Sequence, residues 1–196
     1  MHRRRFIAVT PALAASGALA LAACTTTPPA SDASPEANAG RRRTIDADVD
    51  ATMTRMYETV HGSRELVGEA RGVLVFPSVI SAGFWIGGQY GQGALRVGSQ
   101  TSGYYSIAAA SFGLQIGAQS KAVVLLFMTQ PALDEFVHSQ GWAAGVDATV
   151  AVVKIGANGN VDTSTATSPV EAIVMTNAGL MAGVSLEGSK ISRLII

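Results

Sequence analysis

The sequence predicts an α+β domain in which short strands form an antiparallel β-sandwich or a closed β-barrel, with an N-terminal amphipathic helix and a short helix near residues 131–139. Three observations predict this fold. Short apolar runs alternate with turn residues at hairpin spacing from residue 73 onward. A glycine-x-x-x-glycine unit recurs as GFWIG, GLQIG, GWAAG and GLMAG. An apolar stripe at helical spacing precedes the first strand.

The repeated unit is interpreted as a strand, because its large apolar residues alternate with glycines and one polar residue. A membrane helix would need an apolar stretch of about 20 residues, and polar residues interrupt every unit. In a strand, the glycines permit bending or the close approach of another element, which we expect to be the N-terminal helix. The alternative is a shallow groove, with Gln89, Gln119 and Asp147 as its candidate lining residues.

Length and charge restrict the possible functions. The chain has 196 residues, 48% of them hydrophobic, which supports one domain with a core. Six of the 14 basic residues form the triplets Arg3–Arg5 and Arg41–Arg43, so beyond residue 43 eight basic residues oppose 12 acidic ones, a net charge of minus four. A mildly acidic domain is a poor candidate for binding nucleic acid.

Residues 1–23 predict an export signal, with Arg3–Arg5 before an apolar run. A transmembrane helix is the alternative, which Pro11, Gly17 and the many alanines disfavour. The string Leu-Ala-Ala-Cys ending at Cys24 resembles the lipobox of bacterial lipoproteins, in which the cysteine is acylated and becomes the new N-terminus. Cys24 is the only cysteine, so no disulfide can form within the chain. Acyl chains on Cys24 would anchor the protein to a membrane.

Two finer interpretations concern export and sorting. Residues 3–7, RRRFI, resemble the core of a twin-arginine signal, and general secretion is the alternative route. Thr25 follows the cysteine where an aspartate would retain enteric lipoproteins at the inner membrane, so we expect anchoring at the outer membrane of a bacterial envelope.

Residues 24–43 are predicted to be a flexible tether, because residues 25–40 are mostly Thr, Pro, Ala and Ser and offer little surface to bury. The domain is then expected to occupy residues 44–196. Arg41–Arg43 are candidates for contact with anionic head groups, and a solvated charge run is the alternative.

A helix is predicted to begin at Thr44, where Asp46, Asp48 and Asp50 suit the positive N-terminal end. Its apolar stripe consists of Ile45, Val49, Met53, Met56 and Val60. We expect the stripe to pack on the sheet, because membrane-surface helices usually have a basic polar face and this one is acidic. Gly62 should end the helix, and residues 63–69 should form a second, shorter one.

The remaining elements are predicted in chain order from apolar runs and turn residues. Strands are expected at 73–76, 81–90, 94–97, 104–110, 114–118, 122–128, 142–155, 170–176, 180–186 and 191–196. Turns are expected at 91–93, 98–103, 119–120 and 158–159. A helix opened by Pro131 should carry Leu133, Phe136 and Val137 on its inward side.

Reactive groups do not cluster along the sequence. His61 and His138 are isolated, so no metal-ligand spacing is present. Asp134 and Glu135 fall in the first turn of a helix, where carboxylates stabilise the dipole. A Gly-x-Ser-x-Gly nucleophile motif is missing from the sequence. We therefore expect no enzyme, no metal and no cofactor, with a hydrolase as the remote alternative.

Four blocks in order resemble the SYLF domain family. They are RGVLVFPSVISAGFWIGGQYGQGALRV (71–97), GYYSIAAASFGLQIGAQSKAVVLLFM (103–128), GWAAGVDATVAVV (141–153) and NAGLMAGVSLEGSKI (177–191). The resemblance implies binding of membrane lipids, especially phosphoinositides, and no known enzymatic activity; some eukaryotic members also bind and bundle actin. Eukaryotic members use a basic N-terminal segment, whereas the corresponding helix here is acidic.

The expected function is that of a lipid-anchored envelope protein whose domain binds lipids. The candidate lipid-binding residues are Arg41, Arg42, Arg43, Arg55, Arg64 and Arg71, with Cys24 as the attachment site. The alternative is a non-catalytic structural or interaction module with a protein partner in the envelope or a host.

Overall fold

The computed structural model describes residues 34–153, 168–176, 179–180, 186 and 188–196, and of residues 83–86, 111–118 and 179–180 it describes the backbone. The chain divides into the units Met1–Asp32 and Ala33–Ile196. The predicted signal peptide and Cys24 lie outside the described residues. The second unit contains both hydrophobic cores.

Helix α1 spans Pro35–Thr59, so the prediction that it begins at Thr44 was wrong. The N-cap is Ser34, whose Oγ accepts a hydrogen bond from the amide of Ala37 at 3.2 Å. Pro35 fits the first helical turn because it has no amide hydrogen to satisfy. Residues 35–43 thus belong to the helix and not to the predicted tether, and Asp46 lies too far inside the helix to act on its N-terminal dipole.

The two shorter helices agree with the sequence. Helix α2 spans Ser63–Glu69 and begins after Gly62, whose φ of 87° is left-handed and suits glycine. Helix α3 spans Gln130–His138, and the hydroxyl of Thr129 accepts a hydrogen bond from the amide of Ala132. The residues of α3 that are buried include Leu133 and Phe136, as predicted.

Strands β1 (Gly72–Val97) and β2 (Gln100–Phe127) form one long antiparallel hairpin closed at Gly98, whose φ is 60°. The predicted breaks at 91–93 and 119–120 are therefore wrong. Gly91 and Gly93 stay in the ladder opposite Ile107 and Tyr105. The glycines bend the chain without ending the strand.

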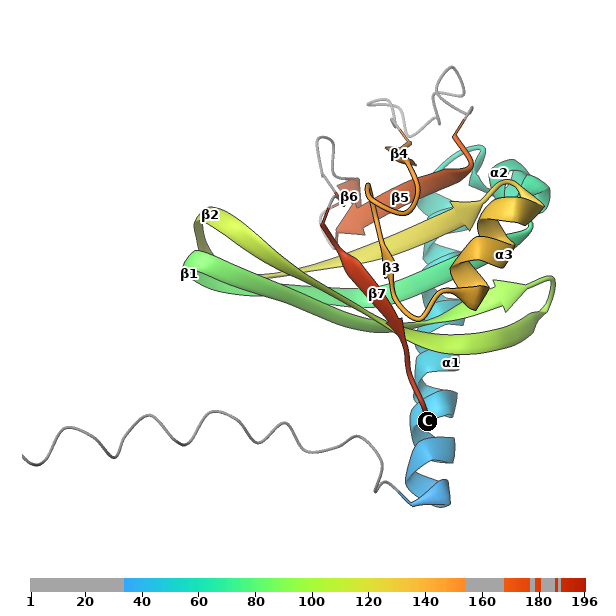
Figure 1. The fold of residues 1–196 in the computed structure, drawn as a ribbon, viewed down its shortest axis with the longest axis horizontal. Coiled ribbons are helices and arrows are strands. Elements are labelled where there is room, and N and C mark those ends of the chain that lie inside the picture. Colours follow the sequence, from blue (N-terminus) through green and yellow to red (C-terminus); the bar gives the residue numbers. More distant parts are fainter. Residues whose placement is uncertain (1–33, 154–167, 177–178, 181–185, 187) are drawn as a thin grey trace, which may run out of the picture. The chain divides into compact units, whose positions relative to one another are not determined.

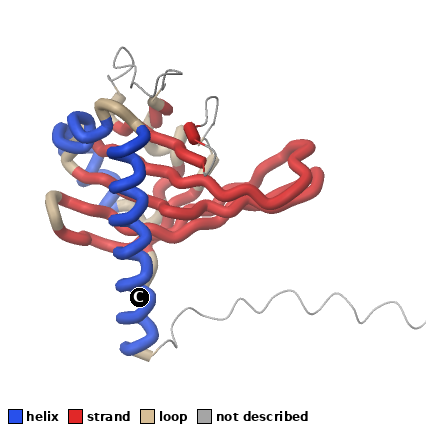
Figure 2. The backbone as a smooth tube through the Cα atoms, turned by 180° about the vertical axis from the view of Figure 1, so that it is seen from behind, coloured by secondary structure: helices blue, strands red, loops and turns tan. Residues whose placement is uncertain are grey.

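The hairpin folds back on itself near its middle (Figures 1 and 2). We call residues 80–90 of β1 and 108–120 of β2 the ribbon bend. Here the first two glycine units face each other, with Gly83 opposite Gly117, and the register shifts after Gly83. The fold-back places Gly93 against the carbonyl of Val75, so closely that a Cβ at Gly93 would collide with that oxygen.

Five shorter strands complete a seven-stranded sheet. They are β3 (Trp142–Ala143), β4 (Val150–Val152), β5 (Val170–Thr176), β6 (Gly179–Leu180) and β7 (Lys190–Arg193). The main path is β3-β7-β2-β5-β4, with β1 paired to β2 and β6 to β5. The sheet is mixed, because β4 runs parallel to β5. It also curls into a half-barrel (Figure 1). The α+β class and the barrel-like curl of the sheet are confirmed, while the sheet is an open half-barrel, is mixed instead of antiparallel, and begins with two long strands in place of several short ones.

The third glycine unit ends a strand instead of occupying the middle of one. Gly145 has a φ of 82°, and the amide of Ala143 donates to Asp147 Oδ2 at 2.6 Å, which closes a tight turn. The strand predicted over 142–155 is consequently split into β3 and β4.

Both faces of the sheet are buried, each by a different helix. The inner core contains Leu74, Phe76, Leu125, Phe127, Trp142 and the inward residues of α3. The outer core contains Val73, Val75, Ala94, Val124 and the stripe of α1. Neighbouring residues of β1 point to opposite cores, which explains the unbroken apolar run at 73–76. Packing of the α1 stripe on the sheet is thereby confirmed.

Helix α1 crosses the sheet away from the tip of the ribbon bend (Figures 1 and 2). The expectation that it covers the glycine units was wrong for the first two of them, because its apolar stripe meets the strand ends. The fourth unit, at 179–183, falls largely outside the described residues.

Candidate functional site

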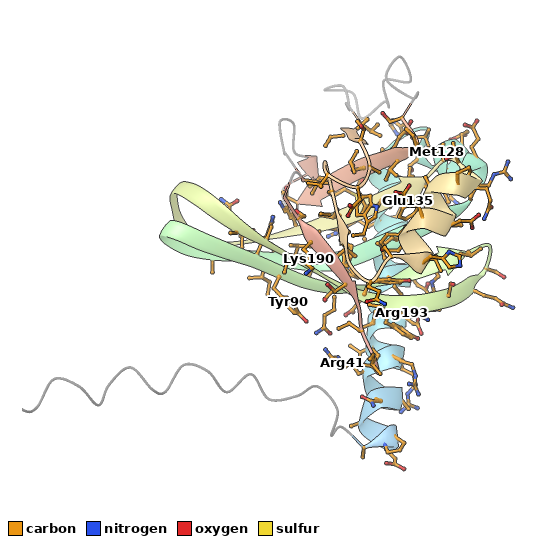
Figure 3. The ribbon with its side chains drawn as sticks, viewed as in Figure 1. Arg41, Tyr90, Met128, Glu135, Lys190 and Arg193 are labelled. Carbon is orange, nitrogen blue, oxygen red and sulfur yellow. The ribbon has the colours of Figure 1, made fainter. Side chains whose placement is uncertain are left out.

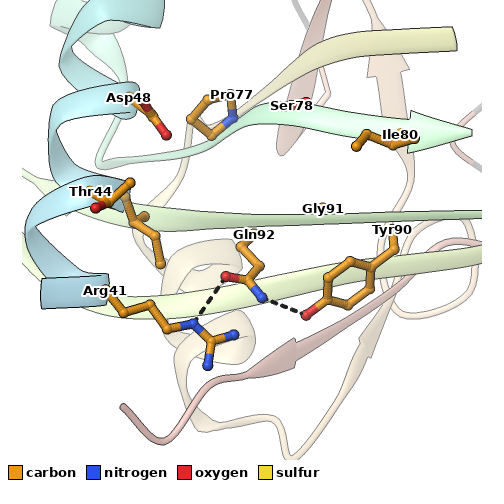
Figure 4. Close-up of a pocket in the computed structure, with 10 residues that line it drawn as sticks. Arg41, Thr44, Asp48, Pro77, Ser78, Ile80, Tyr90, Gly91 and Gln92 are labelled. Atoms are coloured by element: carbon orange, nitrogen blue, oxygen red, sulfur yellow. Dashed lines mark hydrogen bonds between the residues drawn. The ribbon is translucent and has the colours of Figure 1, made fainter. Parts of the chain in front are cut away.

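A pocket of 310 Å³ lies between the N-terminal half of α1 and the outer face of β1 (Figure 4). We call it the α1–β1 pocket. Helix α1 contributes Arg41, Thr44, Ile45 and Asp48, and β1 contributes Pro77, Ser78, Ile80 and residues 90–92. Its volume is at the lower end of the roughly 300–1,000 Å³ usual for small-molecule sites.

Arg41 is positioned by a short chain of hydrogen bonds (Figure 4). Its Nε donates to Gln92 Oε1 at 3.2 Å, and Gln92 Nε2 donates to the Tyr90 hydroxyl at 2.8 Å. The terminal nitrogens of Arg41 lie on the far side of the guanidinium from Gln92. They are suited to a planar anionic group such as a phosphate or carboxylate.

The rest of the pocket wall is largely apolar. Ile80 is 54% exposed and Tyr90 is 49% exposed, which is high for large apolar side chains. Gln92 lies between these two side chains and Arg41 (Figure 4). The pocket therefore has a cationic end at Arg41 and an apolar end at Ile80 and Tyr90 (Figures 3 and 4). Such a division of polarity fits an amphipathic ligand.

A second polar cluster holds α1 to the hairpin on the other side of the pocket. The carboxylate of Asp46 accepts hydrogen bonds from Thr101 Oγ1 at 2.8 Å and from the Tyr104 hydroxyl at 2.7 Å. Arg96 forms ion pairs with Asp46 at 3.4 Å and with Asp50 at 2.8 Å. These contacts join residues 46–58 positions apart in sequence, so the cluster fixes the helix against the sheet that forms the pocket.

The pKa of Tyr104 reflects this cluster. Burial raises it above its ordinary value, and the hydrogen bond and negative charge of Asp46 raise it further, while Arg42 and Arg96 lower it. Tyr104 therefore stays protonated and continues to donate to Asp46. This contact is structural and leaves the α1–β1 pocket as the candidate site.

The candidate arginines do not share one surface. Arg41 to Arg43 lie on α1 about 20 Å of helix rise before Arg55. Arg64, on α2, stacks over the ring of Tyr57 at 4.3 Å, and Arg71 is exposed at the entry to β1. Among the six candidates, Arg41 is the one that lines the pocket.

The candidate groove is not assembled as predicted. Gln89 and Gln119 both lie in the ribbon bend, opposite Ala109 and Ser81, on the ribbon face away from Ile80. Asp147 is engaged by the amide of Ala143 in a turn after β3. Gln89 and Gln119 therefore share one face of the bend, Asp147 belongs to a separate turn, and the pocket lies on the opposite, outer face.

Gln92 and Tyr90 were missed as functional candidates. Gln92 was assigned to a turn and Tyr90 to the end of a strand, so neither was associated with Arg41, 51 positions away from Gln92. The available signal was the period-two alternation of Tyr90, Gln92 and Ala94, which places all three on one strand face.

Within the described part of the chain, no three His, Cys, Asp or Glu side chains gather closely enough to hold an ion. Nor do the helices of that part include one with the length and apolar character required to cross a bilayer.

Comparison with known proteins gives one family match. The family model described as "Ysc84: Las17-binding protein actin regulator" matches residues 108–194, which run from β2 to β7. None of the curated proteins matches the chain. The match confirms the SYLF resemblance over this part of the chain.

Proposed function

We propose that this chain, of which residues 108–194 match the SYLF family model, is a membrane-anchored lipoprotein whose folded unit binds the head groups of anionic lipids at the α1–β1 pocket. The position of Arg41 carries the proposal. Its guanidinium is held at the pocket by Gln92, and an apolar wall begins beside it. A lipid presents the same two chemistries, an anionic head group joined to apolar chains.

Charge in the pocket favours a single small head group over a broad anionic surface. Asp48 also lines the pocket, while Asp46 and Asp50 are engaged with Arg96 nearby. The acids limit the net positive potential, so recognition depends on directed hydrogen bonds from Arg41 more than on long-range attraction. In this proposal, one positioned arginine takes the place of the basic N-terminal segment of the eukaryotic relatives.

Cys24 supplies the anchor in this proposal. Acyl chains on its sulfur and amino group hold the protein at the bacterial envelope, with the outer membrane as the destination. The folded unit then meets lipids at high local concentration, so a weak site is sufficient. The domain acts by binding and not by catalysis.

The test is vesicle flotation of residues 33–196, the unit that contains both cores and has no cysteine. Vesicles of phosphatidylcholine with phosphatidylglycerol are compared with phosphatidylcholine alone at low salt. Arg41→Ala should weaken binding to anionic vesicles about fivefold, since one arginine near an anionic surface contributes about 1 kcal/mol. The matched control is Arg43→Ala, two residues away, exposed and outside the pocket.

Equal binding by the two variants would remove the pocket from the proposal. A wild-type unit that floats with neither vesicle type would contradict lipid binding by the domain itself.

The second candidate is an interaction module that docks a protein. The family description favours it, since it names Las17 binding and actin regulation for the family. Crosslinking in intact cells that captures one defined protein through residues 33–196, with no vesicle binding, would support this alternative.

A further inference from the structure

The outer face of the ribbon bend is exposed at each position whose side chain the structure describes, and few of these side chains are polar. Cross-strand partners share a face, and on this face Ala82, Gly88 and Ala110 are exposed. Ile80 and Tyr90 extend the same face to the rim of the α1–β1 pocket. The pocket and the bend therefore form one surface.

Charged residues are missing from the bend. Residues 80–90 and 108–120 contain no Asp, Glu, Lys, Arg or His, while they include Phe84, Trp85, Ile86, Phe112, Leu114 and Ile116. Soluble proteins rarely leave such a segment projecting from the body without a partner. Figure 1 shows the bend extending away from the helices.

The backbone of the bend limits how deeply it can enter a bilayer. Strand β2 pairs with β7 through Ala108 and with β5 from Lys121, so between these positions its partner among the described strands is β1. The outer edge of the ribbon keeps amide and carbonyl groups that need water or lipid head groups. The interfacial zone satisfies these groups, and it is also the depth preferred by Trp and Tyr.

We infer that the ribbon bend inserts its apolar outer face into the interfacial layer of a lipid bilayer, while Arg41 at its base binds a head group. This inference rests on the proposed lipid binding. It adds a second contact of different chemistry, placed along the same surface as the first. A second copy of the chain is the competing occupant, and the cation at the base of an uncharged apolar surface favours a bilayer.

One double variant tests the bend without touching the pocket. It combines Ala82→Asp with Ala110→Asp, which add charge at exposed positions that do not line the pocket. Binding of residues 33–196 to vesicles should fall roughly tenfold, because charges at a lipid-facing position are costly even near the interface. Val146→Asp is the control, since Val146 is 78% exposed in the turn after β3.

Tryptophan fluorescence gives an independent readout. The chain has two tryptophans, and Trp142 is 1% exposed within the inner core. Trp85 alternates with Ala82 and Gly88 along β1, so the reporter is placed on the outer face as Ala110→Trp in a Trp85→Phe background. Brominated lipids should quench the emission of this tryptophan, more strongly with bromine near the head groups than at the chain ends, and leave the emission of Trp142.

The outcomes separate the two ideas. Loss of binding in the aspartate variant with normal binding in Arg41→Ala would retain the bend and overturn the pocket. Normal vesicle binding by the aspartate variant with loss of binding in Arg41→Ala would overturn insertion of the bend. Vesicle binding without quenching of the tryptophan emission would overturn it as well. A lipid-free dimer by light scattering that Ala82→Asp with Ala110→Asp dissociates would assign the surface to a second copy and also overturn it.

Discussion

The same two strands have opposite surroundings at their packed end and at their bend. At the packed end, Val75 and Val124 lie under α1, while Phe76 and Phe127 lie in the inner core, all at 0% exposure. At the bend, Ile80 is 54% exposed, and neither residues 80–90 nor residues 108–120 include a charged side chain. One ribbon thus provides both the core and an uncovered apolar surface.

The difference separates stability from binding along the length of a strand. Apolar residues at the packed end are removed from water by folding and contribute to the free energy of unfolding. Apolar residues at the bend remain in water and contribute only when a partner covers them. Substitutions at the two ends should therefore affect different measurements.

Phe127→Ala at the packed end should give the largest effect. Phe127 lies 4.8 Å from the Phe136 ring and 6.3 Å from the Trp142 ring, between centroids. The cavity should lower the free energy of unfolding by about 3–5 kcal/mol, measured by urea denaturation of residues 33–196. Ile80→Ala should change it by less than about 0.5 kcal/mol. Equal losses would contradict the division between the two ends.

Two glycines offer a smaller and more local comparison. A Cβ at Gly93 collides with the carbonyl of Val75, whereas the nearest atom to a Cβ at Gly88 is 4.0 Å away. Gly93→Ala should destabilise the fold by about 1–3 kcal/mol because the halves of β1 must separate. Gly88→Ala in the bend should be close to neutral, with thermal melting as the measurement. A neutral Gly93→Ala would show that close approach of the halves is not required.

Glu171 is a buried ionisable residue within the otherwise apolar packed end. Its replacement should give the smallest change in the free energy of unfolding, and this change should be a gain. Glu171 is 1% exposed, and both carboxylate oxygens are without a hydrogen-bond partner among the described residues. Burial raises its pKa above the ordinary value of 4.5, and the charge of Glu69 raises it further. Glu171→Met should stabilise the unit by about 1–2 kcal/mol at neutral pH.

The pH dependence gives this prediction its sign. With a raised folded pKa, the native state holds a proton that the unfolded state releases, so wild-type stability falls as pH rises from about 4.5 through the folded pKa. The methionine variant has no such loss, and its advantage should grow over that window in denaturation at successive pH values. An advantage that stays constant with pH would contradict a protonated Glu171.

Local signals in the sequence predicted the helices well. Gly62 and Ser63 marked α2, and Thr129 with Pro131 marked α3, because capping depends on adjacent residues. The start of α1 was missed, since the small polar residues before Thr44 indicated a tether although Ser34 and Pro35 form an N-cap. Packing of the α1 stripe on the sheet stabilises the helix, including its first turns before Thr44.

Strand continuity and the site were harder to predict. Glycines at 91 and 93 indicate a turn by local rules. The strand needs them because Ser78 and Val79 approach Gly91 and Val75 approaches Gly93. Arg41 was selected for its charge among six arginines, yet its partner Gln92 could not be identified without the fold-back that brings β1 beneath α1. Long-range geometry of this kind leaves no local pattern.

The fold-back also has a consequence for the order of folding. Pairing can begin beside Gly98 and extend from Val97–Gln100 toward Gly72–Phe127, with each step closing a slightly longer loop. That process produces a long, two-stranded ribbon with little core. The two cores are complete only when the ribbon is bent and its halves meet at Gly93 and Val75, so we expect this long-range collapse to be the slow step of folding. The glycine-rich bend is then expected to matter for assembly as well as for the surface of the native protein.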